Sequence, residues 1–217
     1  SQGKVYWADT TENTVGRVPI AGGAAEAVAT GQDRAVGGAA DEQSVYWTNY
    51  TSGSVMKIDA AGGAPTLLGW GDLPRTIVEH GDAVYWANDT GNGLRSVPKA
   101  GGPVVLTPVF ARSVAVDDVN VYWSSVVVGD WNLYGRPLAG GPTFLLAADV
   151  TAFSISTDGQ FVYYHDVGCQ CIGKVPVGGG PKTTMATGVV EVFNIVNDDK
   201  AVYWTDDKTG TVGKVAK

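Results

Sequence analysis

Two tryptophans and three arginines are the residues best suited to binding a partner, because the internal repeat of the chain does not account for them. Trp70 and Trp131 fall between repeat motifs, whereas the other five of the seven tryptophans belong to one. Arg75 and Arg112 occupy the same position of successive repeats, and Arg34 lies within two residues of it. Guanidinium groups bind carboxylates and phosphates, and tryptophan is enriched in contact surfaces. These residues predict a surface that binds a protein or a small anionic ligand.

Trp131 and the three arginines also have a purely structural explanation. Trp131 can fold back over the edge of its own sheet, since singly exposed aromatic residues are common on proteins. Each arginine can pair with a carboxylate of a neighbouring loop, as charges near strand ends usually do.

Other reactive residues are few. His80 and His165 are the only histidines, and we expect them on opposite faces of the molecule, where they cannot share one active site. The chain has no glycine-rich phosphate loop, no zinc-type Cys/His spacing and no nucleophile elbow. Cys169 and Cys171, the only cysteines, can form a small disulfide, remain free thiols or contribute to a soft metal site. We therefore expect no catalytic residue, metal or cofactor.

The elements that position these residues follow from a repeated triplet. Val-Tyr-Trp or a close variant recurs six times at intervals of 37 to 41 residues, a period typical of arrays of small supersecondary units. Its three bulky residues in succession predict a strand that is covered on both faces. The triplets begin at Val5, Val45, Val84, Val121, Val162 and Val202.

Further strands are predicted on either side of each triplet. A short β-rich segment precedes five of the triplets, at residues 34–40, 75–79, 112–116, 153–157 and 193–197. A third strand follows each triplet and generally stops at a proline, which cannot donate to a sheet. A Gly-Gly turn then leads to a short apolar fourth strand, because glycine pairs supply the positive φ of hairpin turns.

Four antiparallel strands repeated every 40 residues or so predict the blades of a β-propeller. We expect an all-β, six-bladed β-propeller forming one domain over residues 1–217, with repeats starting near residues 1, 34, 75, 112, 152 and 193. The first blade lacks its first strand and the last blade its fourth. Three explanations are open: a three-stranded first blade, a partner chain or self-association that completes the end blades, or a trimmed chain.

The triplet also carries a family resemblance. Tyr203-Trp204-Thr205-Asp206 matches the Tyr-Trp-Thr-Asp motif of propellers of the low-density-lipoprotein-receptor type, and Tyr46-Trp47-Thr48-Asn49 differs from it by one residue. With Val-Pro and Ala-Gly-Gly after the motif, the chain looks closest to bacterial repeat proteins of this class. The resemblance implies six blades and a structural role for the motif aspartate, which ties its loop by hydrogen bonds. The motif residue is Asp9, Asp166 and Asp206 in three copies, Asn49 and Asn88 in two, and Ser125 in one. The alternative for this row of residues is a calcium site.

Composition narrows the possible partners. A net charge of −7 and a pI near 4.7 argue against a nucleic-acid partner, which needs a cationic face. No run of 18 apolar residues exists, so we expect no membrane insertion. No signal peptide precedes Ser1, and the expected location is extracytoplasmic or secreted.

The sequence therefore predicts a non-enzymatic binding or protein-interaction propeller. We expect Trp70 in the loop that leads to Arg75, between two blades, and Trp131 in a lengthened loop of residues 125–131, between the second and third strands of its blade. Because these two kinds of loop emerge on one face, we place Trp70, Arg75, Arg112 and Trp131 together there. The alternatives are a metal-dependent hydrolase or lyase with a site in the propeller channel, and a purely structural repeat array, excised or designed. Glu79, Asn194 and Asn197 are the first-strand residues that suit such a metal site, and they are scattered along the chain.

Overall fold

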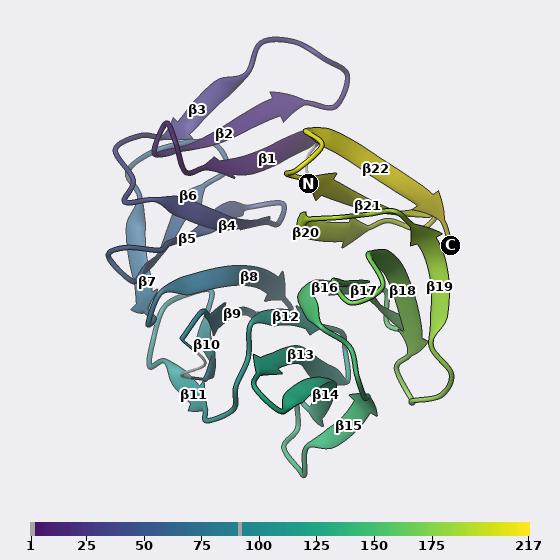
Figure 1. The fold of residues 1–217 in the computed structure, drawn as a ribbon. Helices are drawn as coiled ribbons and strands as arrows, with labels where there is room; N and C mark the ends of the chain where they lie inside the picture. Colours follow the sequence, from purple (N-terminus) through teal and green to yellow (C-terminus); the bar gives the residue numbers. More distant parts are fainter. Residues whose placement is uncertain (1–2, 91–92) are drawn as a thin grey trace. The chain divides into compact units, whose positions relative to one another are not determined.

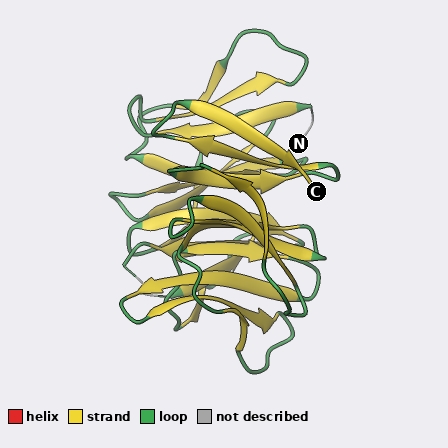
Figure 2. Cartoon of the chain, turned by 45° about the vertical axis from the view of Figure 1, so that its right-hand side comes forward, coloured by secondary structure: helices red, strands yellow, loops and turns green. Residues whose placement is uncertain are grey.

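The computed structural model describes residues 3–90 and 93–217, and every regular element within them is a strand (Figure 2). The predicted start of the first repeat, Ser1, lies outside the described residues. The strands form six antiparallel sheets, each of three or four strands that follow one another in sequence order. The all-β, six-bladed β-propeller predicted from the repeat is therefore confirmed, with three strands in the first and last blades.

The chain divides into two compact units, Ser1–Val109 and Phe110–Lys217. The first unit contains three blades, and Figure 1 shows their strands in purple to teal. The first blade is β1 (Lys4–Asp9), β2 (Thr14–Pro19) and β3 (Glu26–Ala29). The second is β4 (Ala35–Ala40), β5 (Ser44–Asn49), β6 (Ser54–Asp59) and β7 (Thr66–Trp70). The third is β8 (Pro74–His80), β9 (Ala83–Asn88), β10 (Leu94–Pro98) and β11 (Val105–Thr107).

The second unit also contains three blades. The fourth blade is β12 (Ser113–Val116), β13 (Asn120–Val127), β14 (Asp130–Pro137) and β15 (Phe144–Ala147). The fifth is β16 (Ala152–Thr157), β17 (Phe161–Asp166), β18 (Cys171–Pro176) and β19 (Thr183–Thr187). The sixth is β20 (Val192–Asn197), β21 (Ala201–Asp206) and β22 (Thr211–Ala216). Each predicted first strand starts within one residue of its observed start.

The two large aromatic residues of each motif strand face opposite sides of the sheet, as predicted. In β5, Trp47 packs with Val15 and Ala29 of the first blade, whereas Tyr46 packs with Ile77 and Trp86 of the third. Successive residues of a strand point to opposite faces, so one Tyr-Trp pair serves two neighbouring blades. Burial of these rings is the main source of cohesion between the blades of the first unit.

The second unit repeats this packing with two tyrosines. Tyr164 of β17 packs with Tyr122 and Leu133 of the fourth blade, and Tyr163 packs with Ile195 and Val202 of the sixth. The variant motif Val-Tyr-Tyr therefore packs against both neighbouring blades, as Val-Tyr-Trp does.

In three blades, the last aromatic residue of the motif pairs with a glycine of the third strand. The pairs are Trp7 with Gly16, Tyr164 with Gly173, and Trp204 with Gly213. A Cβ atom added to any of these glycines would collide with the ring. The ring occupies the space that a side chain would need, so glycine is required there by close approach.

An aspartate before the motif strand holds the tyrosine. Oδ1 of Asp41 accepts hydrogen bonds from the backbone N–H groups of Gln43 and Ser44, each at 2.8 Å. Oδ2 of Asp41 accepts a hydrogen bond from the Tyr46 hydroxyl at 3.0 Å, and it forms a salt bridge with Lys99 Nζ at 2.8 Å. Because Lys99 belongs to the third blade, this turn joins two blades by charge as well as by packing.

The same arrangement recurs in the second unit. Asp158 accepts a hydrogen bond from the Tyr163 hydroxyl at 2.8 Å, and Lys217 Nζ of the sixth blade lies 2.7 Å from its Oδ2. The Lys217 ammonium also lies 5.0 Å from the centre of the Tyr163 ring, within the range of a cation–π interaction. We call the two sets Asp41–Tyr46–Lys99 and Asp158–Tyr163–Lys217 the lysine clamps.

Buried hydroxyl groups join first strands of neighbouring blades. Ser154 Oγ of β16 accepts a hydrogen bond from the N–H of Ile195 in β20 at 2.9 Å. Replacing Ser154 with alanine leaves that buried N–H without its partner, so we expect the free energy of unfolding to fall by about 1–3 kcal/mol. Urea denaturation measures the change.

Ser156 of the same strand is the matched control, because its Oγ has no hydrogen-bond partner in the part of the chain that the structure describes. Ser156→Ala should change the free energy of unfolding by no more than about 0.5 kcal/mol. Equal losses for the two variants would show that the link between β16 and β20 does not stabilise the fold.

Candidate functional site

Four side chains of the first unit meet at one end of the second and third blades. Arg34 immediately precedes β4 and Tyr50 follows β5, whereas Arg75 lies near the start of β8 and Asp89 follows β9. Because the first two strands of a blade are antiparallel, the start of one and the end of the other lie at the same end of the sheet. We call Arg34, Tyr50, Arg75 and Asp89 the loop cluster.

The loop cluster is held by one shared carboxylate. The Tyr50 hydroxyl donates a hydrogen bond to Asp89 Oδ2 at 2.8 Å, and Arg75 Nη1 lies 3.7 Å from the same oxygen. The Arg34 guanidinium carbon lies 4.7 Å from the centre of the Tyr50 ring. Two guanidinium groups therefore contact one tyrosine–aspartate pair, Arg34 through the ring and Arg75 through the carboxylate.

Backbone contacts fix these positions. The Tyr50 N–H donates to the Arg34 carbonyl at 3.0 Å, and the carbonyl of Arg75 accepts a hydrogen bond from Thr48 Oγ1 at 3.1 Å. Arg34 has a φ of 58°, a left-handed conformation that non-glycine residues rarely adopt and that is frequent at functional sites. The N–H of Arg34 is held by Asn13 Oδ1 at 3.0 Å.

The hydrogen bond to Asp89 keeps the Tyr50 hydroxyl protonated. The hydrogen bond to Asp89 is the largest cause that raises the pKa of Tyr50, burial adds to it, and the positive charges of Arg75 and Arg34 act against it. Tyr50 is thus a neutral hydroxyl donor at physiological pH. The cluster thus presents two guanidinium groups, which bind carboxylates and phosphates.

Trp70 lies at the other end of the loop that leads to Arg75. We predicted it within that loop, but it is the last residue of β7, because the strand pairing extends to Ser54↔Trp70. Its side chain is 55% exposed, and its carbonyl accepts a hydrogen bond from Arg95 Nη1 at 2.7 Å.

Trp131 and Arg112 belong to the second unit. We predicted Trp131 in a long loop of residues 125–131, but β13 and β14 continue as a hairpin in which Val126 pairs with Trp131. The β-branched Val126 and Val127 favour this extension, and Gly129, with a φ of 86°, makes its turn. Trp131 remains 38% exposed.

Arg112 stacks on an aromatic ring. Its guanidinium carbon lies 4.4 Å from the centre of the Phe153 ring. Arg75 pairs with a loop carboxylate, Asp89, as the structural explanation predicted. The structure thus places Trp70 and Arg75 in one unit and Arg112 and Trp131 in the other. That all four form one surface stays a prediction.

The motif aspartates cap their loops, as the resemblance implied. Asp9 Oδ1 accepts the N–H groups of Thr11 and Glu12 at 2.8 and 2.9 Å. Asp166 and Asp206 likewise each accept backbone N–H groups of their own loop and of the loop that leads into their blade.

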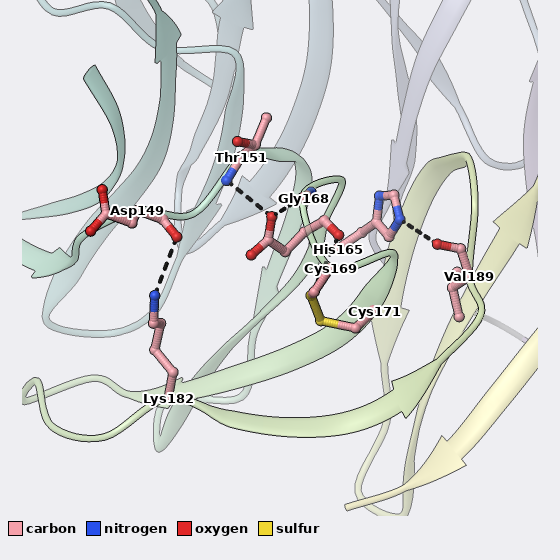
Figure 3. Close-up of a disulfide and its surroundings, with 9 residues drawn as sticks. Asp149, Thr151, His165, Gly168, Cys169, Cys171, Lys182 and Val189 are labelled. Carbon is pink, nitrogen blue, oxygen red and sulfur yellow. Dashed lines mark hydrogen bonds between the residues drawn. A yellow bond between two sulfur atoms is a disulfide. The ribbon is translucent and has the colours of Figure 1, made fainter. Parts of the chain in front are cut away.

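His80 and His165 lie in different units. His80 ends β8, and His165 is a buried residue of β17 whose Nε2 donates to the Val189 carbonyl at 2.9 Å (Figure 3). Within residues 3–90 and 93–217, no three His, Cys, Asp or Glu side chains are grouped so that they could hold a metal ion. The two cysteines form a disulfide.

A pocket of about 410 Å³ lies in the first unit, away from the loop cluster's strand ends. Arg17, one of its lining residues, is already bound to Glu26 at 3.0 Å and to the Ala60 carbonyl at 2.8 Å. Both signs of charge line the pocket, through Lys4, Arg17, Glu42 and Asp59.

No membrane-spanning helix is present among the described residues.

No protein-family model matches the sequence, and no curated protein matches it by sequence. Solved structures match by fold. The structure of a nidogen/laminin complex contains a chain with a TM-score of 0.85 and 20% identity, over 98% of this chain and 88% of that one.

Two enzymes share the fold as well. A streptogramin B lyase matches with a TM-score of 0.79 and 14% identity, over 99% of this chain and 76% of the lyase. A gluconolactonase from Xanthomonas campestris matches with a TM-score of 0.80 and 13% identity, over 99% of this chain and 82% of that one. At these identities the likeness shows the fold alone.

Proposed function

We propose that this chain is a protein-binding propeller of the Tyr-Trp-Thr-Asp type, located outside the cytoplasm, that recognises carboxylate groups of its partner. The loop cluster, with Trp70 beside it in sequence, supplies the contacts of the first unit. Arg112 and Trp131 supply those of the second unit.

The observation that carries the proposal is the shared carboxylate of the loop cluster. Asp89 is bound by the Tyr50 hydroxyl and lies beside the Arg75 guanidinium, while Arg34 stacks on the ring of the same tyrosine. The guanidinium groups of Arg34 and Arg75 are of the kind that binds a carboxylate brought by a partner. Arginines held by stacking lose little conformational freedom on binding, which favours recognition.

The type of propeller is supported by two further observations. Residues Tyr203 to Asp206 match the Tyr-Trp-Thr-Asp motif, and Asp206 holds its loop as the resemblance implies. The fold is shared with the chain in the nidogen/laminin complex, which favours a protein partner. Since lyase and lactonase propellers have the same fold, the proposal rests on the loop cluster and not on this likeness.

A titration with a short acidic peptide tests the proposal. The peptide carries glutamates, its control carries glutamines at the same positions, and free glutarate serves as a small anion. We expect the acidic peptide alone to shift the side-chain N–H signals of Arg34 and Arg75 in NMR spectra, with binding that weakens as salt is added. Binding of glutarate as tight as that of the peptide would show a small-anion site instead of a protein-binding one.

Charge-matched variants separate the loop cluster from the overall charge. Arg34→Gln and Arg75→Gln, each made alone, should each weaken binding of the acidic peptide at least tenfold, a loss of about 1.4 kcal/mol or more. Arg136→Gln, on β14 of the other unit, removes the same kind of charge and should leave the affinity within about twofold, or about 0.4 kcal/mol. Equal losses in all three variants would mean that the loop cluster is not the site.

A further inference from the structure

The loop between β17 and β18 contains a disulfide that closes a very small ring. Cys169 and Cys171 are bonded around a single residue, Gln170, with Cα atoms 5.2 Å apart (Figure 3). Neither the blade packing nor the proposed binding surface uses this bond. The role of this disulfide therefore lies outside both.

The disulfide adds little to the stability of the fold. Every residue from Phe161 to Asp166 of β17 is already paired with β18, and the last pair, Asp166↔Cys171, includes one of the cysteines. The stabilisation from a cross-link grows with the length of the loop that it closes, and this loop is close to the shortest possible.

The backbone inside the ring is also constrained. Gln170 has a φ of 50°, in the left-handed region that a residue with a side chain enters at a cost. Asn13, Gly53 and Gly210, at the same place in the loops of three other blades, are also left-handed although no disulfide closes those loops. The turn itself therefore sets this conformation, and the loop should keep it when the disulfide opens.

The two sulfur atoms differ in access. Cys169 lies in the exposed part of the loop, whereas Cys171 begins β18 and is only 3% exposed. An attacking thiolate can therefore reach one sulfur atom more easily than the other. Such asymmetry gives a thiol–disulfide exchange reaction a defined order.

We propose that Cys169–Cys171 is a redox-active disulfide that exchanges with small thiols. A thiolate attacks Sγ of Cys169, the bond between the two sulfurs breaks, and its electron pair passes to Sγ of Cys171, which takes a proton. A second thiolate then attacks the sulfur of the bound small thiol. The small disulfide leaves, and Cys169 departs as a thiolate that takes a proton. The protein disulfide is reduced to two thiols while two small thiols are oxidised to one disulfide.

Reduction of the Cys169–Cys171 disulfide is expected to affect the loop between β19 and β20. The Gln170 carbonyl accepts a hydrogen bond from the Val189 N–H at 2.9 Å. The Val189 carbonyl accepts one from His165 Nε2 at 2.9 Å, and Figure 3 shows this second bond. The small ring is thus joined to the loop between β19 and β20. None of these hydrogen bonds involves sulfur, so the fold should survive reduction.

Equilibration of the native protein with glutathione tests the proposal. Samples are held at a series of ratios of reduced to oxidised glutathione without denaturant, quenched with acid, alkylated and analysed by mass spectrometry. We expect the dithiol fraction to rise and fall reversibly with the ratio, while the far-ultraviolet circular dichroism spectrum is unchanged. A pair that stays oxidised until denaturant is added would overturn the proposal.

Two single variants test the order of attack. Cys171→Ser leaves the exposed thiol and should form one adduct with oxidised glutathione. Cys169→Ser leaves the buried thiol and should form its adduct at least tenfold more slowly. Equal rates would contradict the assignment of Cys169 as the attacked sulfur, and the outcome is independent of the loop cluster, because the cysteines lie outside it.

Discussion

Replacing Trp47 with alanine is expected to lower the free energy of unfolding by about 3–5 kcal/mol, the largest loss among the changes considered. The side chain is fully buried and packs between the first two blades, against Val15 and Ala29. Its indole Nε1 also donates a hydrogen bond to Gln32 Oε1 at 2.8 Å. The substitution therefore opens a cavity and removes one of the two hydrogen bonds that Gln32 Oε1 accepts, the other coming from Asn49 Nδ2.

Trp70→Ala is the matched control, because it removes the same side chain from an exposed place in the neighbouring strand β7. We expect its effect on stability to stay within about 0.5 kcal/mol, as for most surface substitutions. Urea denaturation of both variants, followed by circular dichroism, gives the comparison. Similar losses would mean that the motif tryptophans do not hold neighbouring blades together.

Acidification from about pH 4 to below about pH 2 is expected to remove about 2–4 kcal/mol of stability through the two lysine clamps. Burial by itself would raise the pKa of Asp41, but the hydrogen bonds from Lys99, the N–H groups of Gln43 and Ser44, and Tyr46 outweigh it and lower that pKa to about 2. The pKa of Asp158 is lowered for the same reasons, with Lys217 as its cation. The figure assumes about 1–2 kcal/mol for each aspartate, reduced for its partial exposure.

The loss of stability on acidification follows from the lowered pKa values of Asp41 and Asp158. A carboxylate whose pKa is lower in the folded state stabilises the fold above its unfolded pKa, and this contribution disappears as the pH falls through the folded value. Asp41→Asn should therefore be less stable than the wild type at pH 7 and lose less stability on acidification. Asp33→Asn, which alters an exposed loop residue, should retain the wild-type pH dependence. Parallel curves for Asp41→Asn and the wild type would contradict the role of the clamp.

The strands were predictable because the repeat shows the same physical requirement six times. A Val-Tyr-Trp strand must be covered on both faces, and the structure covers Tyr46 and Trp47 from opposite sides. The glycine pairs marked the turns for a similar reason: Gly22 and Gly23 have φ values of 90° and 137°, which glycine adopts without strain.

The candidate site was only partly predictable. Arg34 and Arg75 were identified because arginine recurs at or near one repeat position, at the start of the first strand, but Tyr50 and Asp89 were missed, since each follows a motif asparagine whose role is structural. Their shared place one residue after Asn49 and Asn88 was the available signal. The strand positions of Trp70 and Trp131 depend on pairing with Ser54 and Val126, and the repeat pattern does not contain that information.

The glycines beneath the motif rings limit how the gene can rearrange. Repeated segments of a gene can recombine with one another. A crossover between the second and third strands of a blade would separate a motif ring from the glycine that pairs with it. Joining Trp7 to a third strand from the second copy would set Met56 in place of Gly16, where the first copy has no room for a side chain. Exchange is therefore expected to be tolerated when whole blades move, and selected against when the breakpoint falls inside one.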